Sequence, residues 1–558
     1  MHLNLRRSAD SLSSVRGSLS LPLVFLGTFF LVAFALPTFS TLLCLFTATF
    51  GYAIFWYALS LVGGPRVQFL LAALWYGSIQ LIQFSWICDG ARYQGLFVLA
   101  LYLSVGAIGG LFFALFTCAL LKNNLNLLKS ATFCAIWTLG EWGRGQVACG
   151  FPINPMGMPI SSSPYSLQLA SIGGPLFLTF LLVFSNIEVL RLIRSPFRGA
   201  LKIFLAALIF LLPQAVGFFL LKRPSTPTLD RPVSVALVQT ALLPCEKLHG
   251  LGPNTLSLEE QWGRIFGLLG RDLDQKIDLL ILPENALPCM VSDKVFSYDV
   301  AQPLIAHHFG EKQASALSLD SDLSNGFFGQ MLANFYGAHC LGGFSRTDGA
   351  GLYYTSCFCF VPNSEKDVDF YDKRKLVPGE YLLFDWCRGV AAKFNIRSFF
   401  EKGSGPRLFS GPLPGLVISP SICYDEFFSE IVREGRCLGA NILLNITNDG
   451  WYPGRGPFSL PEQHYSHARL RAVELGAPLL RCCNTGVTAI IDENGAEIAR
   501  LPLSASSGGD HPSLLLHSFM PRVKSTLYTL WGDLFVLLLS CAIILLSMVL
   551  RLRRGCVK

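Results

Sequence analysis

The stretch Gly95–Leu120, GLFVLALYLSVGAIGGLFFALFTCAL, contains 26 residues and no charged side chain. A run of about 20 apolar residues is the length that an α-helix needs to cross a bilayer. The pattern continues on the N-terminal side, since only three charged residues occur in the 105 positions Gly17–Leu121. Over all 558 residues, 52% are hydrophobic and 15% are charged, whereas a soluble globular protein has about 25% charged residues. The sequence therefore predicts a polytopic membrane protein and argues against an ordinary soluble enzyme.

Eight apolar segments along the chain are candidates for spanning helices. They are Leu21–Leu36, Ser40–Leu61, Val67–Ile87, Gly95–Leu120, Ala131–Gly140, Gly174–Leu190, Ile203–Leu221 and Leu527–Leu550. The fifth is short, and Glu141 and Arg144 follow it directly, so this helix must begin earlier or continue past these charges. The segments predict an N-terminal membrane domain of seven helices in residues 1–223, a separate block in residues 224–525, and a C-terminal transmembrane helix with a basic tail in residues 526–558.

Lys and Arg residues near the ends of these segments predict the orientation of the chain, because cytoplasmic loops carry an excess of both. If the N-terminus is cytoplasmic, fourteen of them lie on that side and four on the other. The fourteen are Arg6, Arg7, Arg16, Arg66, Lys122, Lys129, Arg191, Arg194, Arg198, Lys202, Arg551, Arg553, Arg554 and Lys558, and the four are Arg92, Arg144, Lys222 and Arg223. Residues 224–525 are thus predicted to lie outside the cytoplasm. The net charge of +7 sits mostly beside apolar runs, so it indicates a membrane partner and no nucleic acid.

Within residues 224–525, predicted strands alternate with predicted helices. The strands are Val233–Gln239, Asp278–Leu282, Leu341–Phe344, Tyr354–Phe360, Gly415–Ser419 and Asn441–Asn445, and the helices are Leu258–Leu269 and Glu462–Gly476. Several strands are continuous apolar runs, which is typical of strands that are buried on both faces. This order fits helices that cover a core of two sheets.

Two residues stand where predicted strands end. Glu284 follows a strand and Pro283, and a partly desolvated carboxylate there would have a raised pKa and could accept a proton. The alternative is a solvated or helix-capping glutamate. Cys423 follows an apolar run and precedes a segment of helical spacing, and the start of a helix favours a thiolate. The alternative here is a buried structural cysteine, one of 17 in the chain.

Other charged residues have weaker signals. Lys373 lies between two predicted strands, where a buried ammonium could hold nearby anions and a developing oxyanion, although a solvated basic loop is the favoured interpretation of this residue taken alone. Glu380 could orient that lysine or lie on the surface. His464 and His467 have the spacing of metal ligands on a helix, but no third ligand is evident, so a supporting role is favoured and no metal is predicted.

The order and contexts of Glu284, Lys373 and Cys423 resemble the Glu-Lys-Cys triad of the nitrilase superfamily, which lies on an αββα sandwich. Seven predicted helices, a nitrilase-like domain and one final helix resemble, more specifically, the apolipoprotein N-acyltransferase family. The local matches are Pro283–Pro288, Tyr371–Lys373 with Leu376–Pro378, Ile422–Tyr424, Asn448–Tyr452 and His464–Ala489. The resemblance covers nearly the whole chain and implies a polytopic α-helical membrane domain with an extracytoplasmic α/β nitrilase-like domain.

The chain departs from the family pattern at four places. One residue is missing in the loop before Glu380, Asp425 replaces a glutamate, Thr355 replaces an asparagine, and Ile153 replaces a tryptophan. The three triad positions are unchanged.

The resemblance implies acyl transfer in two steps. Cys423, deprotonated by Glu284, attacks the sn-1 ester of a phospholipid and forms a thioester and a lysophospholipid. The α-amine of a diacylglyceryl-cysteine apolipoprotein then takes the acyl chain. Lys373 and backbone amides near Asp425 hold the oxyanion, and no cofactor or metal is needed. The supporting or substrate-binding residues that it implies are Glu380, Tyr424, Asn448, Trp451 and Tyr452.

The implied location is the bacterial inner membrane, with the catalytic domain on the periplasmic side. Two other functions compete with acyl transfer. A membrane-tethered nitrilase-type amidase would use the same triad, but seven helices are excessive for an anchor. A transporter would bury ionisable residues along its path, and few occur in the spans. The first span could also be a cleaved signal peptide, with Ala33–Ala35 as its cleavage site, which would leave the later orientation unchanged.

Overall fold

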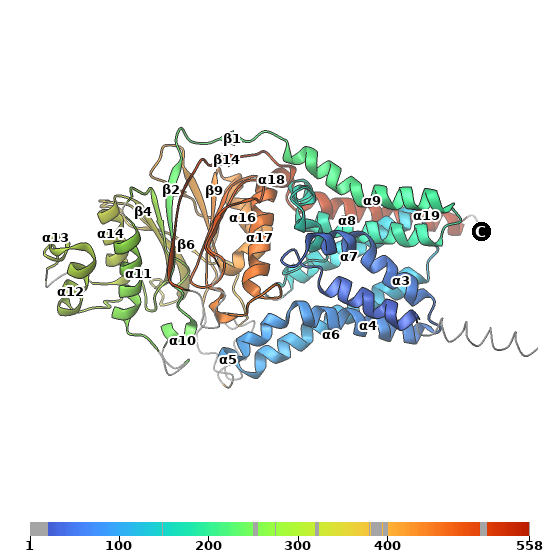
Figure 1. The fold of residues 1–558 in the computed structure, drawn as a ribbon, viewed down its shortest axis with the longest axis horizontal. Helices are drawn as coiled ribbons and strands as arrows, with labels where there is room; N and C mark the ends of the chain where they lie inside the picture. Colours follow the sequence, from blue (N-terminus) through green and yellow to red (C-terminus); the bar gives the residue numbers. More distant parts are fainter. Residues whose placement is uncertain are drawn as a thin grey trace, which may run out of the picture.

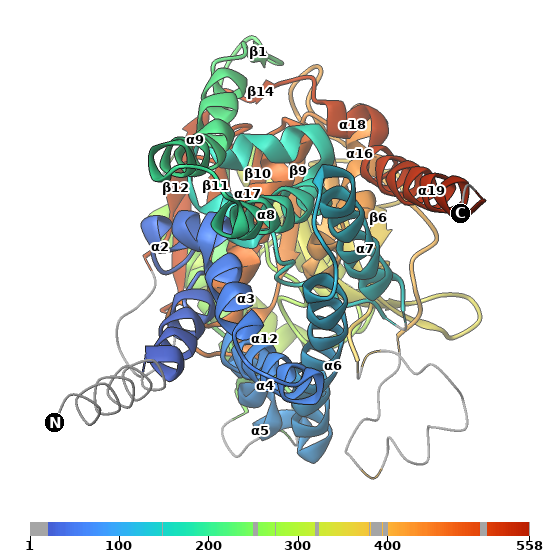
Figure 2. The ribbon, with the colours of Figure 1, turned by 90° about the vertical axis from the view of Figure 1, so that its right-hand side faces the viewer.

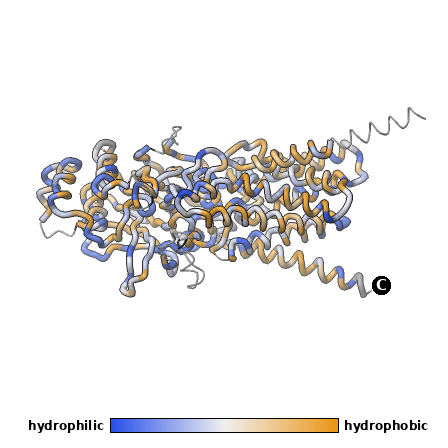
Figure 3. Tube along the Cα trace, turned by 90° about the horizontal axis from the view of Figure 1, so that it is seen from below, coloured by the Kyte–Doolittle hydropathy of each residue, from blue (hydrophilic) through white to orange (hydrophobic). Residues whose placement is uncertain are grey.

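The computed structural model describes residues 20–556 except 148, 249–250, 252–254, 274, 319–322, 379, 381–392, 394–399 and 503–510. The molecule is elongated, with a helical bundle at one end and an α/β domain at the other (Figure 1). Hydrophobic residues run along the helices of the bundle, whereas the α/β domain alternates hydrophobic and hydrophilic segments (Figure 3). The chain enters the α/β domain from the bundle and returns to the bundle with its last helix.

The bundle is built from segments at both ends of the chain. Its elements are the helix Ser20–Ala33, α2 (Thr41–Phe46), η1 (Thr47–Gly51), α3 (Tyr52–Ser60), α4 (Pro65–Gln83), η2 (Ser85–Gly90), α5 (Ala91–Gln94), α6 (Leu96–Leu121), α7 (Leu127–Gln146), η3 (Met158–Ser162), η4 (Ser166–Leu169), α8 (Ala170–Arg194), α9 (Gly199–Leu221) and α19 (Leu534–Cys556). Although α19 comes last in sequence, it packs against α7 (Figure 2).

Five helices among the described residues are long and apolar enough to cross a membrane. They are Thr41–Ser60, Leu96–Leu121, Ser166–Arg194, Gly199–Leu221 and Leu534–Arg553. A sixth span results if α4 and the segment Ser85–Tyr93, which meet at a bend of 55°, are counted together. The helix Ser20–Ala33 is shorter, and α7 carries Glu141 and Arg144 inside its C-terminal end. Several apolar helices are thus present, and the number of eight spans stays a prediction.

The outward faces of the bundle are apolar. In α9 only Gly217 is buried, and the large apolar side chains of this helix face outward. Such a surface is stable in lipid and costly in water. Inside the bundle, α4 and α6 approach closely because small residues face each other. A Cβ atom at Gly77 would lie 2.9 Å from the carbonyl oxygen of Gly106, so these two backbones touch directly.

The α/β domain contains two six-stranded sheets. The first has the order β13-β2-β3-β4-β5-β6 and the second has the order β12-β11-β10-β9-β8-β7. The strands of the first are β13 (Ser513–Phe519), β2 (Val233–Gln239), β3 (Leu279–Ile281), β4 (His339–Thr347), β5 (Tyr353–Phe360) and β6 (Asp369–Asp372). Those of the second are β12 (Glu497–Arg500), β11 (Ala489–Ile491), β10 (Leu479–Cys483), β9 (Ile442–Thr447), β8 (Val417–Ile422) and β7 (Phe409–Ser410). Each sheet has three central parallel strands, β2-β3-β4 and β8-β9-β10.

Helices cover the outer face of each sheet, which gives the predicted four-layer αββα sandwich. Side chains of both sheets form the central core, among them Leu237, Leu341 and Ile446. The first sheet is covered by α11 (Leu258–Asp272), α12 (Tyr298–Phe309) and α14 (Asn325–Tyr336), and the second by α16 (Ser429–Cys437) and α17 (Leu460–Leu475). The predicted strands and helices of this domain all lie within or beside observed elements, with ends that differ by a few residues.

The two connections between the bundle and the domain are paired with each other. Strand β1 (Thr226–Pro227) follows α9 and pairs antiparallel with β14 (Arg522–Val523), which leads to α18 (Leu527–Trp531) and α19. On the domain side, α17 and α18 pack against α8. The short segments η2 and α5 extend from the bundle beside the α/β domain, near the short helix α10 (Pro244–Lys247) (Figure 1).

Candidate active site

Glu284 lies in the loop that follows β3 and Pro283, and it is buried. The adjacent strand passes directly beneath it, since a Cβ atom at Gly343 would lie 2.6 Å from the Cα atom of Glu284. Only glycine fits at that position. From the other sheet, the side-chain amide of Asn484 donates a hydrogen bond to the backbone carbonyl of Glu284. The backbone of this carboxylate is therefore held from both sheets.

Lys373 follows β6 and is 1% exposed. Its ammonium donates hydrogen bonds to Oε1 of Glu284 at 2.9 Å and to Oε1 of Glu380 at 3.0 Å. The second oxygen of Glu380 accepts from the backbone N–H of Val377 at 3.1 Å. Both carboxylates raise the pKa of Lys373 well above its ordinary value, although burial opposes this. The lysine thus stays cationic and bridges two carboxylates.

The loop before Glu380 is one residue shorter than the family pattern, and it still brings Glu380 to Lys373. Gly379 itself lies outside the described residues.

Cys423 comes directly after β8 and starts the short helix η6 (Cys423–Phe427). Its φ angle is +48°, in the left-handed region that non-glycine residues rarely adopt. Such a conformation at the end of a strand turns the side chain sharply out of the sheet and is stored strain of the kind found at functional sites. The side chain is only partly buried, in contrast with those of Glu284 and Lys373. It is the accessible member of the group.

Asp425 ties the Cys423 turn to the Lys373 loop. Its carboxylate accepts hydrogen bonds from the backbone N–H of Ile422 at 3.1 Å and from the hydroxyl of Tyr371 at 2.8 Å. It also accepts from the backbone N–H groups of Arg374 at 3.1 Å and Lys375 at 2.7 Å. Asp425, although shorter than the glutamate of the family pattern, therefore bonds to the Cys423 turn and to the Lys373 loop and holds the two together.

The electrostatics of the three residues describe a resting thiol beside a carboxylate. Burial raises the pKa of Glu284, and the charge of Lys373 opposes this rise. Burial also raises the pKa of the Cys423 thiol, and the nearby negative charge of Glu284 adds to it. The expected effect of the helix start on the thiolate stays a prediction, and η6 is a short helix of five residues. Glu284 and the Cys423 thiol are close enough for each to affect the pKa of the other, which suits a proton transfer between them.

Three further sequence-predicted residues lie in the loop that follows β9. Asn448 accepts from the backbone N–H of Gly450 at 3.2 Å and shapes the turn after β9. Trp451 packs edge-on against Tyr93, with ring centroids 5.6 Å apart. Tyr452 packs in the same way against Trp86 at 5.1 Å. Both aromatic side chains thus contact the segment Ser85–Gln94 of the bundle.

Tyr424 also contacts the bundle. Its hydroxyl donates a hydrogen bond of 2.6 Å to the backbone carbonyl of Gly150, in the loop after α7. Gly150 has a φ angle of +77°, and a Cβ atom there would lie 2.7 Å from the ring of Phe428. A glycine is thus required at position 150, where the bundle contacts Tyr424.

A buried ionic cluster that the sequence did not reveal lies behind the loop of Trp451. The carboxylate of Asp449 is 2.9 Å from Nδ1 of His464 and 3.1 Å from the guanidinium of Arg481, which is also 3.3 Å from Glu426. The charges of Arg481 and His464 hold the pKa of Asp449 below its ordinary value. His464 is thus buried in this cluster and does not lie on the surface, which was one of the two roles that its sequence favoured. The signal for Arg481 was a charge inside the apolar strand β10.

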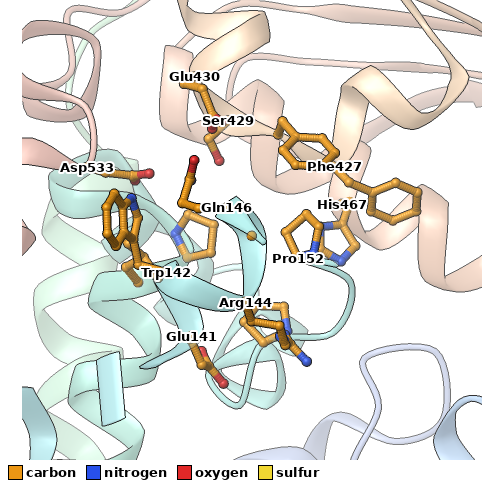
Figure 4. Close-up of a pocket in the computed structure, with 15 residues that line it drawn as sticks. Glu141, Trp142, Arg144, Gln146, Pro152, Phe427, Ser429, Glu430, His467 and Asp533 are labelled. Atoms are coloured by element: carbon orange, nitrogen blue, oxygen red, sulfur yellow. The ribbon is translucent and has the colours of Figure 1, made fainter. Parts of the chain in front are cut away.

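A cavity of about 50 Å³ lies where the bundle meets the α/β domain, separate from the triad. Arg144 and Glu141 of α7 border it on one side and Ser429 and Glu430 of α16 on the other (Figure 4). His467 also borders it, and its Nε2 accepts from the backbone N–H of Asn154 at 3.3 Å. None of the three triad residues lines this cavity.

Two family models match the chain. The carbon-nitrogen hydrolase model matches residues 234–507, and the model of the apolipoprotein N-acyltransferase N-terminal domain matches residues 17–187. Among solved structures, the yeast Nit3 protein of Saccharomyces cerevisiae, a member of the nitrilase superfamily, is 16% identical and has a TM-score of 0.36. It covers 53% of this chain and 92% of its own.

The chain is similar to apolipoprotein N-acyltransferases of several bacteria. That of Chlamydia caviae is 30% identical over 545 residues, which are 93% of this chain and 95% of the relative. That of Chlamydia pneumoniae is 28% identical over 92% of this chain and 94% of its own. That of Haemophilus influenzae is 28% identical over 86% and 84%. Since the similarity extends through the bundle and the α/β domain alike, the chain belongs to the apolipoprotein N-acyltransferase family and is an acyltransferase with a nitrilase-like catalytic domain.

Proposed function

We propose that this enzyme transfers the sn-1 acyl chain of a phospholipid to the N-terminal α-amine of diacylglyceryl-cysteine apolipoproteins, through a thioester on Cys423. The observation that carries this proposal is the buried Lys373, which bridges Glu284 and Glu380 at 2.9 and 3.0 Å beside a cysteine in a strained turn. A general base, a fixed cation and an accessible thiol are the groups that acyl transfer through a covalent intermediate needs.

In the first step, Glu284 accepts the proton of the Cys423 thiol as the sulfur attacks the ester carbonyl carbon. Lys373 and backbone amides near Asp425 stabilise the negative charge that develops on the carbonyl oxygen. The bond between the carbonyl carbon and the glycerol oxygen then breaks. Glu284 returns its proton to that oxygen, and a lysophospholipid leaves. The raised pKa of Glu284 suits a group that must take and return a proton.

In the second step, the α-amine of the lipoprotein attacks the thioester carbonyl carbon. Glu284 accepts a proton from the amine, the carbon–sulfur bond breaks, and the thiolate of Cys423 regains a proton. An amide forms and the enzyme returns to its resting state. All atoms come from the ester, the amine and the three side chains, so the reaction as proposed uses no cofactor or metal.

The contacts between the bundle and the loops around Cys423 support lipid substrates. Tyr424 bonds to the loop after α7, and Trp451 packs against α5, so the reactive thiol lies beside the membrane half. We place the protein in the bacterial inner membrane, with residues 224–525 on the periplasmic side between a membrane domain in 1–223 and a final helix in 526–558. The supporting residues would be Glu380, Tyr424, Asn448, Trp451 and Tyr452.

The test uses the full chain in detergent–phospholipid micelles with a fluorescent phospholipid and a diacylglyceryl-cysteine peptide. Mass spectrometry should detect an acyl group on Cys423 without the peptide and an N-acylated peptide when it is added. In a parallel assay, small amides should be hydrolysed poorly. Efficient amide hydrolysis without any N-acylated peptide would replace the acyltransferase reaction by that of a tethered amidase.

A topology experiment tests the location separately. A reporter that is active only outside the cytoplasm should be active when fused near Gly415 and silent when fused after Lys558. The reverse pattern would place the catalytic domain in the cytoplasm and contradict access to exported lipoproteins.

A further inference from the structure

A second lysine is buried next to the candidate active site. Lys247 is the last residue of α10 and is 4% exposed. A lysine side chain is seldom buried unless a partner holds its ammonium. The partner here is the backbone carbonyl of Asn285, the residue directly after Glu284, to which the ammonium of Lys247 donates a hydrogen bond. The lysine therefore holds the backbone beside the general base and lies outside the triad.

The backbone that Lys247 holds has an unusual conformation. Asn285 has a φ angle of +41°, so the chain turns sharply directly after Glu284. A left-handed residue other than glycine persists only where its surroundings fix it. Two successive carbonyls are fixed here, that of Glu284 by the amide of Asn484 and that of Asn285 by Lys247. The direction of the Glu284 side chain depends on both anchors.

The helix α10 also contacts the rest of the candidate site. The hydroxyl of Tyr93 is 3.8 Å from the sulfur of Cys245, and a Cβ atom at Gly450 would lie 3.3 Å from the ring of Pro244. Tyr93 is the residue against which Trp451 packs. The same four-residue helix thus touches the bundle, the loop of Trp451 and the turn of Glu284.

The charge of Lys247 acts on Glu284 as well. Burial lowers the pKa of Lys247 to about 7, and the negative charge of Glu284 opposes this fall. The charged or titratable groups that face Glu284 are Lys373, Glu380, Cys423 and Lys247. A protonated Lys247 therefore favours the carboxylate form of the general base.

We propose that Lys247 is a positioning residue for acyl transfer, whose ammonium holds the Asn285 carbonyl and thereby aims the carboxylate of Glu284 at the Cys423 thiol. The inference rests on the proposed function, because it requires Glu284 to act as the base. Lys247 itself does not touch the substrate. Its removal should slow the formation of the acyl-enzyme and leave the affinity for phospholipid almost unchanged.

The experiment compares the full chain with Lys247→Met and Lys247→Arg in micelles, and it measures acylation of Cys423 without an acceptor. In Lys247→Met, kcat for acylation should fall about 10- to 100-fold, as expected for a misplaced catalytic group, while KM stays within about twofold. The acid limb of kcat/KM should move to higher pH, because a cation that favours the Glu284 carboxylate is lost. Lys247→Arg should restore part of the rate. Lys312→Met, at an exposed lysine of α13 (Glu311–Ala314), is the matched control.

Each outcome decides the inference. An unchanged acylation rate and acid limb in Lys247→Met would overturn it, and so would a loss confined to KM. If Lys247→Met does not fold, Lys247→Gln provides the same pH measurement, and an unshifted acid limb there would count against a positioning role. The proposed function fails in a different way, since the unaltered enzyme would then form no acyl-enzyme on Cys423 at all.

Discussion

The two sides of the candidate site are built differently. On the triad side, Glu284, Lys373 and Glu380 bond to one another and to backbone groups of the α/β domain. On the other side, Tyr424 and Trp451 contact the bundle through one hydrogen bond and one aromatic pair. The proposed catalytic groups thus contact one another inside the α/β domain, whereas Tyr424 and Trp451 contact the bundle. Substitutions on the two sides should therefore have effects that differ both in the property they change and in magnitude.

The largest effect is expected at the nucleophile. Cys423→Ala should abolish both the acyl-enzyme and acyl transfer, because the proposed thioester forms on the sulfur of this residue. Intact-mass measurement of the purified chain after incubation with phospholipid detects the missing adduct. Cys541→Ala, at an exposed cysteine of α19, is the control and should keep full activity. Near-normal transfer by Cys423→Ala would remove the triad from the mechanism.

The next effect tests the base on the same side. Glu284→Gln should slow acylation by at least about 10²-fold, the lower range for loss of a general base. In the unaltered enzyme the pKa of Glu284 is raised, so the carboxylate is protonated, and unable to accept a proton, at pH values somewhat above its ordinary 4.5. Activity should therefore rise with pH through that raised value. A pH–rate profile of single-turnover acylation checks this, and a flat profile down to pH 4.5 would contradict it.

A smaller effect, on stability, is expected behind the Trp451 loop. Asp449→Asn removes one of the two carboxylates that contact the buried Arg481 and should lower the free energy of unfolding by up to about 3 to 5 kcal/mol. The folded-state pKa of Asp449 is lowered, so its contribution is complete above the unfolded value of about 3.9 and is lost as pH falls below it. Thermal unfolding of the parent and the variant at pH 7 and at pH 3 measures the loss of stability and its dependence on pH. A variant as stable as the parent at pH 7 would show that the cluster contributes nothing.

The smallest effect is expected on the membrane side. Tyr424→Phe removes the hydrogen bond to Gly150 and keeps the ring. If the lost bond raises the activation free energy by about 0.5 to 1.5 kcal/mol, the rate of phospholipid acylation should fall about two- to tenfold. Tyr353→Phe, at an exposed tyrosine of β5, is the control. A loss as large as that of Glu284→Gln would mean that this tyrosine takes part in the chemistry. The distinction between the two sides would then fail.

Much of the fold could be predicted because its signals are local. Apolar runs predict the strands. Strand ends indicate Glu284 and Cys423, and the motif matches add Lys373; the structure brings the three together. The bend of 55° after α4 was missed, since a continuous apolar run carries no sign of it. Lys247 was missed because a lysine in a polar loop is normally solvated. Its burial depends on contacts with Asn285, which is distant in sequence and becomes a neighbour only in the folded domain.

The pairing of β1 with β14 and the packing of α19 on α7 have a consequence for biosynthesis. Domains fold in the order in which they are made, so the helices up to α9 are complete before the α/β domain emerges. The strand β14 and the helix α19 are translated only after the other strands of the α/β domain. A chain that terminates before residue 522 would contain Glu284, Lys373 and Cys423. It would lack the pairing of β1 with β14 and the packing of α19 on α7. The contacts that join the two halves through β14 and α19 can therefore form only after both halves have been made.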